Sequence, residues 1–230
     1  MIFASDENGN RINIRDAERN KKYTCPCCGA DLIQKRGRIV QHHFAHKALA
    51  ECVSYYDNKG AWHRSMQELF PERNVEVFNN QYGRHIFDVL TDANRIIEFQ
   101  NSPISYYEFQ DRTDAYSSYA KTANAQRPIW VFNYTERYFF TYEKGHNRFR
   151  KIRWYRPTTI FAWYNKESSY ELWFRIKPMR YRPDVDGKYI TFHDERLTIG
   201  YLKVFGIYDE KYVYGDVYTE KEFFDYLKSL

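Results

Sequence analysis

Two short apolar runs, each carrying one carboxylate, constrain this chain more than any other feature. The first reads HIFD over residues 85–88 and the second reads RIIEFQNS over residues 95–102. Side chains alternate along a strand, so Glu98 and Gln100 share one face while the residues beside them turn into a core. Opposed side chains of an antiparallel pair lie roughly 5 Å apart. The pattern therefore predicts that Asp88 and Glu98 bind one divalent cation.

Such a site suits the metal-assisted hydrolysis of a phosphodiester bond. A divalent cation on two carboxylates can activate a water, and a polar group two residues after Glu98 can orient it. Gln100 stands at that position. The alternative is a strand that ends in a turn at Asp88 and leaves Glu98 and Gln100 on a solvated face. The order of the surrounding elements favours the metal site.

Composition favours a sheet-rich α+β fold. The 230 residues include 22 Tyr, 17 Phe and 5 Trp, and aromatic residues are enriched in strands. The net charge of +5, from 35 basic and 30 acidic residues, gives a weak attraction for anions. No early apolar run resembles a signal peptide and no apolar run is long enough to span a membrane. We expect a cytoplasmic protein without membrane contact.

All four cysteines lie in the first quarter of the chain. Such clustering favours a metal site over disulfide bonds. The turn CPCCG over residues 25–29 aims two thiolates at one point, and HHFAH over residues 42–46 offers the remaining ligands. The predicted structural zinc ligands are Cys25, Cys28, His43 and His46. Cys27 could replace Cys28, and His42 or Cys52 could replace a histidine.

The pattern between residues 57 and 135 predicts a helix, three strands, a helix and a strand. Trp62, Met66 and Phe70 recur at helical spacing before Pro71, which ends the helix. Three short strands follow, and the second and third carry the carboxylates. Ser105 with Glu108 forms a capping-box pattern that opens a helix through about residue 122, and a buried strand follows at residues 128–132.

This order, with Asp on the second strand and Glu-x-Gln on the third, resembles the PD-(D/E)XK nuclease core. Together with the cysteine knuckle, HFAH at 43–46, Trp62-His63 and EFQNSPIS at 98–105, it resembles the competence-protein CoiA-like nuclease family. The resemblance implies a metal-dependent DNA nuclease in which Asp88 and Glu98 hold Mg²⁺ or Mn²⁺. His63 matches the histidine of the family's first helix, which could bind the metal, contact phosphate or transfer a proton.

The chain departs from the PD-(D/E)XK pattern at positions that matter for catalysis, and these departures suggest a second possible function. Gln100 occupies the position that is lysine in most PD-(D/E)XK enzymes, and an amide cannot supply a positive charge. Gln67 stands where a lysine is often found, and no glutamate precedes His63 to give a third carboxylate. The alternative is therefore a non-catalytic nucleic-acid-binding protein that retains the fold.

Three regions follow from these patterns: a zinc-binding module at residues 1–56, the nuclease core at 57–135, and a β-rich extension at 136–230 that ends in a helix. Basic and aromatic residues alternate early in the extension, which is typical of nucleic-acid contact and equally of an exposed hairpin. The candidate DNA contacts are Arg112, Lys144, Arg148, Arg150, Lys151 and Arg153. A homodimer and a partner protein in recombination or defence stay open.

Overall fold

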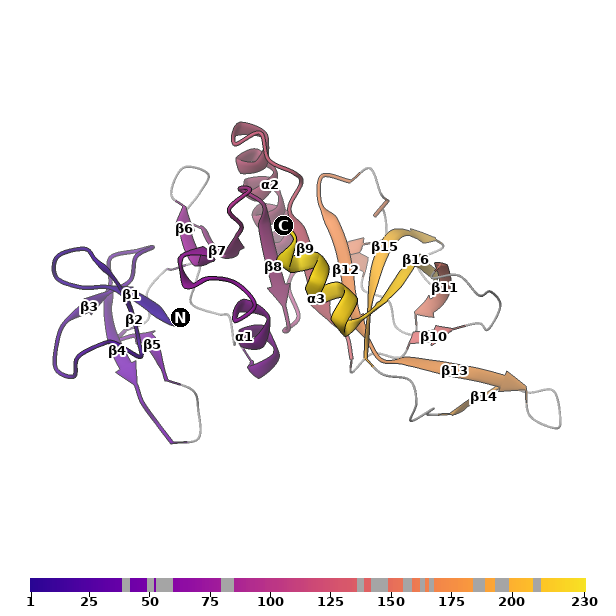
Figure 1. Cartoon of the computed structure of the whole chain (residues 1–230), viewed down its shortest axis with the longest axis horizontal. Coiled ribbons are helices and arrows are strands. Elements are labelled where there is room, and N and C mark those ends of the chain that lie inside the picture. The colour runs from indigo at the N-terminus through magenta and orange to yellow at the C-terminus, as the bar shows by residue number, and fades with distance from the viewer. Residues whose placement is uncertain are drawn as a thin grey trace.

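The structure is a computed structural model of the whole chain (Figure 1). It describes residues 1–38, 42–48, 52, 60–79, 85–135, 139–141, 149–154, 159–161, 164–165, 168–183, 189–192, 199–208 and 212–230. Two sheets and a few helices make up this part of the chain, which confirms the predicted α+β class. None of the described helices is long and apolar enough to cross a membrane.

An antiparallel five-stranded sheet forms the N-terminal module at one end of the molecule (Figure 1). Phe44 and Tyr23 pack their rings with centroids 5.1 Å apart in its small core, where three of the four cysteines are also buried. In spatial order its strands are β2 (Arg11–Asn13), β1 (Phe3–Ser5), β3 (Tyr23–Thr24), β4 (Asp31–Lys35) and β5 (His43–His46).

The predicted order of helix, three strands, helix and strand is confirmed in the middle of the chain. Ser105 caps the second helix by accepting a hydrogen bond from the Glu108 amide at 3.2 Å. Strands β6, β7 and β8 are antiparallel neighbours, and β9 runs parallel to β8. The elements are α1 (Ala61–Gln67), the 3-10 turn η1 (Glu72–Asn74), β6 (Val75–Asn79), β7 (His85–Leu90), β8 (Ile96–Gln100), α2 (Tyr106–Thr122) and β9 (Ile129–Asn133).

The strands after residue 136 continue the same sheet. Strand β12 pairs in parallel with β9 and antiparallel with β15, so the sheet has the order β14-β13-β10-β11-β16-β15-β12-β9-β8-β7-β6. The added elements are β10 (Phe139–Thr141), β11 (Phe149–Trp154), η2 (Thr159–Phe161), β12 (Glu171–Ile176), β13 (Pro178–Pro183), β14 (Tyr189–Phe192), β15 (Gly200–Tyr208), β16 (Tyr212–Thr219) and α3 (Glu220–Lys228).

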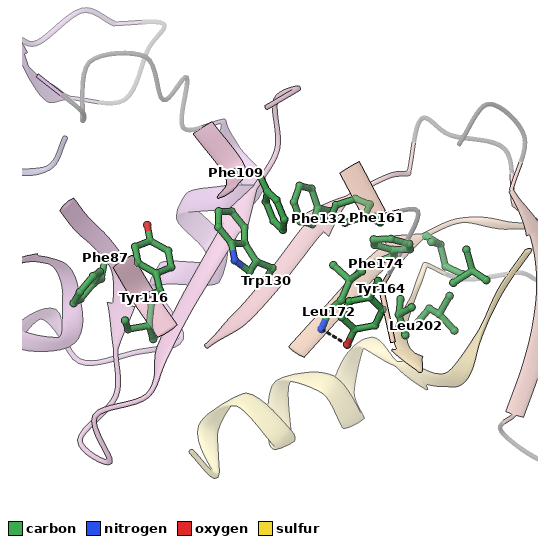
Figure 2. Close-up of a cluster of buried hydrophobic side chains, with 14 residues drawn as sticks. Phe87, Phe109, Tyr116, Trp130, Phe132, Phe161, Tyr164, Leu172, Phe174 and Leu202 are labelled. Atoms are coloured by element: carbon green, nitrogen blue, oxygen red, sulfur yellow. Dashed lines mark hydrogen bonds between the residues drawn. The ribbon is translucent and has the colours of Figure 1, made fainter. Parts of the chain in front are cut away.

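Aromatic side chains fill the space between α2 and one face of the large sheet. Phe109 and Tyr116 of α2 pack on Trp130 and Phe132 of β9, and the two β9 rings stack with centroids 5.6 Å apart (Figure 2). Each such pair adds about 1 kcal/mol beyond the area it buries. The opposite face is covered by α1 and α3, whose residues Met66, Phe223 and Leu227 cluster with Ile97 and Phe99 of β8.

A buried carboxylate joins the C-terminal strands to the nuclease core. Glu171 of β12 lies 3.2 Å from the Arg95 guanidinium, just before β8, and 3.3 Å from the Lys203 ammonium of β15. Its other oxygen accepts hydrogen bonds from Trp173 at 2.6 Å and Tyr226 at 2.9 Å. Burial alone would raise the pKa of Glu171, but Arg95 and these other partners together hold that pKa below its usual value.

This network gives the stability of the fold a defined dependence on pH. Because the folded pKa of Glu171 lies below the usual 4.5, its contribution is complete above that value and is lost as the pH falls through the folded pKa. Glu171→Gln leaves Arg95 buried without its counter-charge, so we expect a loss of about 3 kcal/mol at neutral pH. Urea denaturation at a series of pH values measures the difference from wild type, which should shrink in acid. A constant difference would contradict the assignment.

Candidate active site and metal cluster

Asp88 is buried, with 1% of its surface exposed, and its carboxylate is fully engaged. The His63 Nε2 lies 3.0 Å from Oδ1, and the Phe99 amide donates to Oδ2 at 3.0 Å. An ionised carboxylate only accepts hydrogen bonds, so we assign the proton of the first bond to His63 Nε2. The Gln67 amide donates to the backbone carbonyl of Asp88 at 3.2 Å. Helix α1 and the backbone of β8 therefore fix this side chain together.

Glu98 is buried completely and is held by the other helix. The Tyr116 hydroxyl of α2 donates to Oε2 at 3.0 Å, and the Arg112 guanidinium forms an ion pair with Oε1. Arg112 also donates to the Tyr116 oxygen at 3.2 Å and lies 3.6 Å from Glu108. The side chain of Arg112, a candidate for DNA contact, is 12% exposed and faces Glu98.

Strands β7 and β8 bring the Asp88 side chain to the backbone of β8. Their pairing puts Val89 opposite Ile97, and the same register would place Asp88 opposite Glu98. The Phe99 amide bonds to the Asp88 side chain. A carboxylate of one strand therefore accepts the hydrogen bond of an amide of the next.

Neither Glu98 nor Gln100 lies on a solvated strand face, so the alternative interpretation of these residues is wrong. Gln100 is 4% exposed, and its amide nitrogen donates to the Ser102 carbonyl at 2.8 Å. His85 is also buried, 3.8 Å from the Asp111 carboxylate and edge-on to Tyr116. Burial lowers the pKa of His85, and Arg112 adds to this effect while Asp111 opposes it.

Asp88 and Glu98 offer carboxylate oxygens, the ligands that Mg²⁺ and Mn²⁺ prefer, but Asp88 contacts α1 and Glu98 contacts α2, which cover opposite faces of the sheet. Beside the two carboxylates, the Gln67 Oε1 is buried and has no hydrogen-bond partner among the described residues. The Gln67 nitrogen lies 3.5 Å from Asp88 Oδ1, so this unsatisfied oxygen belongs to a side chain that lies beside Asp88. A cation or a water bound to it would satisfy that oxygen. Cation binding at Glu98 has to compete with Arg112.

A second group of side chains in the N-terminal module could hold a metal ion such as zinc. The ligand atoms of Cys25, Cys28, His46 and Cys52 all lie within 4.8 Å of one another. The Cys25 and Cys52 sulfurs are 3.7 Å apart, and the Cys28 sulfur is 3.4 Å from His46 Nε2. A tetrahedral zinc with Zn–S bonds of roughly 2.3 Å separates its sulfurs by roughly 3.8 Å. These spacings fit zinc.

The fourth member of this group is Cys52 in place of the predicted His43. His43 and His46 are the two ends of β5, and side chains three residues apart in a strand point to opposite faces. Cys52 was the alternative that the sequence left open. Among the described residues, Cys27 is buried nearby but is not part of the cluster.

The turn that carries the first two ligands depends on Gly29. This glycine has a φ of 73°, in the left-handed region, and its amide donates to the Cys25 carbonyl at 2.8 Å. Burial raises the pKa of the Cys25 and Cys27 thiols to about 12. Burial also lowers the pKa of His46, which favours the neutral imidazole that binds metals. Metal binding would therefore release protons from the thiols.

Sequence reasoning selected His63, which contacts Asp88, but it missed that Arg112 and Tyr116 hold Glu98. Arg112 and Tyr116 are four residues apart, so they share a helix face, and this spacing was the available signal. Gln67 was singled out only as a departure from the family pattern. Of the other candidate DNA contacts, Arg150, Lys151 and Arg153 lie on β11, and Lys144 and Arg148 lie outside the described residues.

Comparison with known proteins places both regions in one family. The model described as Competence protein CoiA, N-terminal domain, matches residues 7–55. The model described as Competence protein CoiA, nuclease-like domain, matches residues 61–182, more than half of the chain, and includes Asp88 and Glu98. No curated protein and no solved structure matches the chain. The chain belongs to the CoiA-like competence protein family, with the nuclease-like domain of that family.

Proposed function

We propose that this protein is a metal-dependent DNA nuclease acting in the cytoplasm. The observation that carries the proposal is the pair of buried carboxylates, Asp88 and Glu98, on two adjacent strands of the nuclease-like domain. Buried charges of this kind are costly unless they are paired or bind a metal. The nuclease-like domain of the family gives the site its reaction class.

In this proposal Asp88 and Glu98 would hold Mg²⁺ or Mn²⁺. The cation, when bound, would acidify a water and neutralise charge on the scissile phosphate. Water adds to phosphorus and one P–O bond breaks, which leaves a phosphate on one end and a hydroxyl on the other. Asp88 keeps its orientation through His63 and the Phe99 amide, so it needs little rearrangement to bind the cation.

Gln100 and His63 have supporting roles. The Gln100 amide can orient the attacking water by hydrogen bonding once it turns from Ser102, although it adds no positive charge. His63 orients Asp88 and can move a proton at its Nε2. Since no lysine stands at residue 100, we propose that Arg112, which pairs with Glu98, could stabilise a phosphate after it leaves that carboxylate.

We further propose that zinc bound by Cys25, Cys28, His46 and Cys52 is structural. All four positions would be filled by protein, so no position is left for substrate. Its role would be to fold the module of residues 1–56 beside the core, and residues 136–230 would extend that core.

The second candidate is a non-catalytic nucleic-acid-binding protein. Two observations favour it: Glu98 is neutralised by Arg112, and the Gln100 amide is turned to Ser102. In that case the carboxylates would serve only to hold the fold together, and DNA binding would not need a divalent cation.

DNA cleavage separates the two candidates. We expect the purified protein to cut labelled DNA with Mg²⁺ or Mn²⁺ but not with EDTA. Asp88→Ala and Glu98→Ala should each lower the rate at least about a hundredfold, because each removes a group that holds the catalytic charge. Asp92→Ala is the matched control, since Asp92 is exposed and pairs with Arg73 away from the site. Activity that survives in both site variants, or its absence with every metal, would favour the binding protein.

Metal content tests the zinc ligands. The protein should contain about one zinc per chain, and Cys52→Ser should lose most of it because one tetrahedral position is left to water. His43→Ala should keep its zinc, whereas His46→Ala should not. Elemental analysis after gel filtration measures all three. Loss of zinc in His43→Ala but not in Cys52→Ser would instead support the ligands predicted from the sequence, with His43 in place of Cys52.

Arg112 gives a thermodynamic test of the cation site. Arg112→Ala leaves the Glu98 charge buried and unpaired, so we expect a loss of about 3 kcal/mol in metal-free buffer. Mn²⁺ should recover part of this loss and should raise the melting temperature of the variant more than that of wild type. Arg95→Ala is the control, because it breaks the buried pair with Glu171 instead. Equal Mn²⁺ effects in the two variants would argue against cation binding at Glu98.

A further inference from the structure

Three polar side chains form a row where three parallel strands of the large sheet end. Strand β9 runs parallel to β8 on one side and to β12 on the other, so all three strands end at the same edge. The pairing places Asn133 beside Arg175, and one step beyond the paired Gln100 it places Asn101 beside Asn133. We call these three residues the edge row. Ligands of open sheets with parallel strands bind outside this edge.

Hydrogen bonds join the edge row from strand to strand. The Asn133 amide nitrogen donates to Asn101 Oδ1 at 2.7 Å, and Arg175 Nη1 donates to Asn133 Oδ1 at 3.4 Å. The residues two positions before Asn133 and Arg175 are Val131 and Trp173, which belong to the cluster that α1 and α3 cover. Because side chains alternate along a strand, the edge row lies on that same face.

Helix α1 connects the edge row with the proposed cation site. The Arg175 guanidinium lies over the Trp62 ring, 5.7 Å from its centroid, and the next residue, His63, contacts Asp88 at 3.0 Å. Neighbouring strands are roughly 5 Å apart, so β12 lies roughly 10 Å from β8. One strand of DNA covers this distance in about three nucleotides, at about 3.4 Å each along the axis.

Arg175 has hydrogen-bonding capacity that its neighbours do not use. A guanidinium has five N–H donors, and the one at Nε is buried without a hydrogen-bond partner among the described residues. Its carboxylate partner is Glu220, 3.7 Å from Nη2, whereas charge-assisted bonds are usually about 2.7–2.9 Å long. The Tyr201 side chain also interacts with this guanidinium but offers only a neutral hydroxyl. The positive charge of Arg175 is therefore only loosely paired.

The loose ion pair opens to solvent at the edge of the sheet. The side chains of Arg175 and Glu220 are 15% and 45% exposed. By contrast, Arg95 is 5% exposed and lies 3.2 Å from Glu171. Lys177, two residues after Arg175, is exposed and adds a second positive charge. Arginine, lysine and asparagine side chains are common contacts of DNA phosphates.

We propose that the edge row binds a phosphate of the DNA backbone close to the scissile bond, with Arg175 as the charged contact. This inference rests on the proposed function, which makes DNA the substrate. The phosphate displaces Glu220 from the guanidinium and supplies a closer anionic acceptor. Contacts to phosphate carry no information about the bases, so the edge row positions DNA of any sequence at the cation site.

DNA binding without cleavage tests the proposal. Fluorescence anisotropy of a labelled oligonucleotide, single-stranded or duplex, is measured with no divalent cation added. Arg175→Ala should weaken binding about tenfold, as expected for the loss of a charged hydrogen bond. It should also reduce the slope of log affinity against log salt concentration by about 1, because one phosphate contact is lost. Glu220→Ala should tighten binding severalfold, since it removes the anion that competes with phosphate.

A purely structural ion pair gives a different result. If Arg175 serves only to hold α3 through Glu220, both alanine variants should melt at a lower temperature and bind DNA as wild type does, which would overturn the proposal. Arg175→Lys keeps the charge and should keep the salt slope while losing part of the affinity. This variant provides the test if Arg175→Ala does not fold.

Arg73→Ala is the matched control, because Arg73 also pairs with a carboxylate, Asp92 at 2.7 Å, but on an exposed surface. Its affinity and salt slope should equal those of wild type, and a loss equal to that in Arg175→Ala would overturn the proposal. A protein that binds DNA through Arg175 but cuts it with no metal would refute the nuclease and leave the phosphate site. Cleavage by wild type together with unchanged binding in Arg175→Ala would do the reverse.

Discussion

The arrangement of the site depends on keeping one carboxylate, Asp88, charged and hydrogen-bonded inside the sheet. Burying such a charge without partners is prohibitive, so its surroundings must supply donors. Helix α1 contributes His63, and β8 contributes the Phe99 amide. A regular ladder would have used that amide for backbone pairing. The hydrogen bond from the Phe99 amide to the Asp88 carboxylate thus replaces a bond of the regular sheet, and Glu98 lies next to it in sequence.

Periodicity was sufficient to predict the elements around the site. The turn at residues 91–94 and the cap at Ser105 divide the chain as expected, and alternation correctly placed Ile97 and Phe99 in a core opposite Glu98. These features are local, so nearby residues encode them. The same reasoning identified β12 and β15 as strands, but it could not show that they join β9, because strand pairing depends on contacts far apart in sequence.

Polar partners were the part that sequence could not supply. Arg112 and Tyr116 reach Glu98 from α2, and Glu76 reaches the N-terminal module through a backbone conformation that favours glycine in most sequences. The spacing of Arg112 and Tyr116 shows that they share a helix face but not that they meet Glu98, and the conformation of Glu76 leaves no sequence pattern. The metal cluster shows a similar limit. The cysteine turn predicted Cys25 and Cys28, whereas the choice between His43 and Cys52 depended on whether residues 43–46 form a strand.

Helix α3 has a consequence for how the chain folds. It covers the same face of the sheet as α1, and its residues Phe223 and Leu227 share a cluster with Ile97 and Phe99, which precede them by more than a hundred positions. During synthesis α1 can cover only its own part of this face, and the part that α3 covers stays exposed until residues 220–228 have left the ribosome. Exposed apolar surface of this kind favours aggregation, so the last helix of the chain protects the strands that carry the acids.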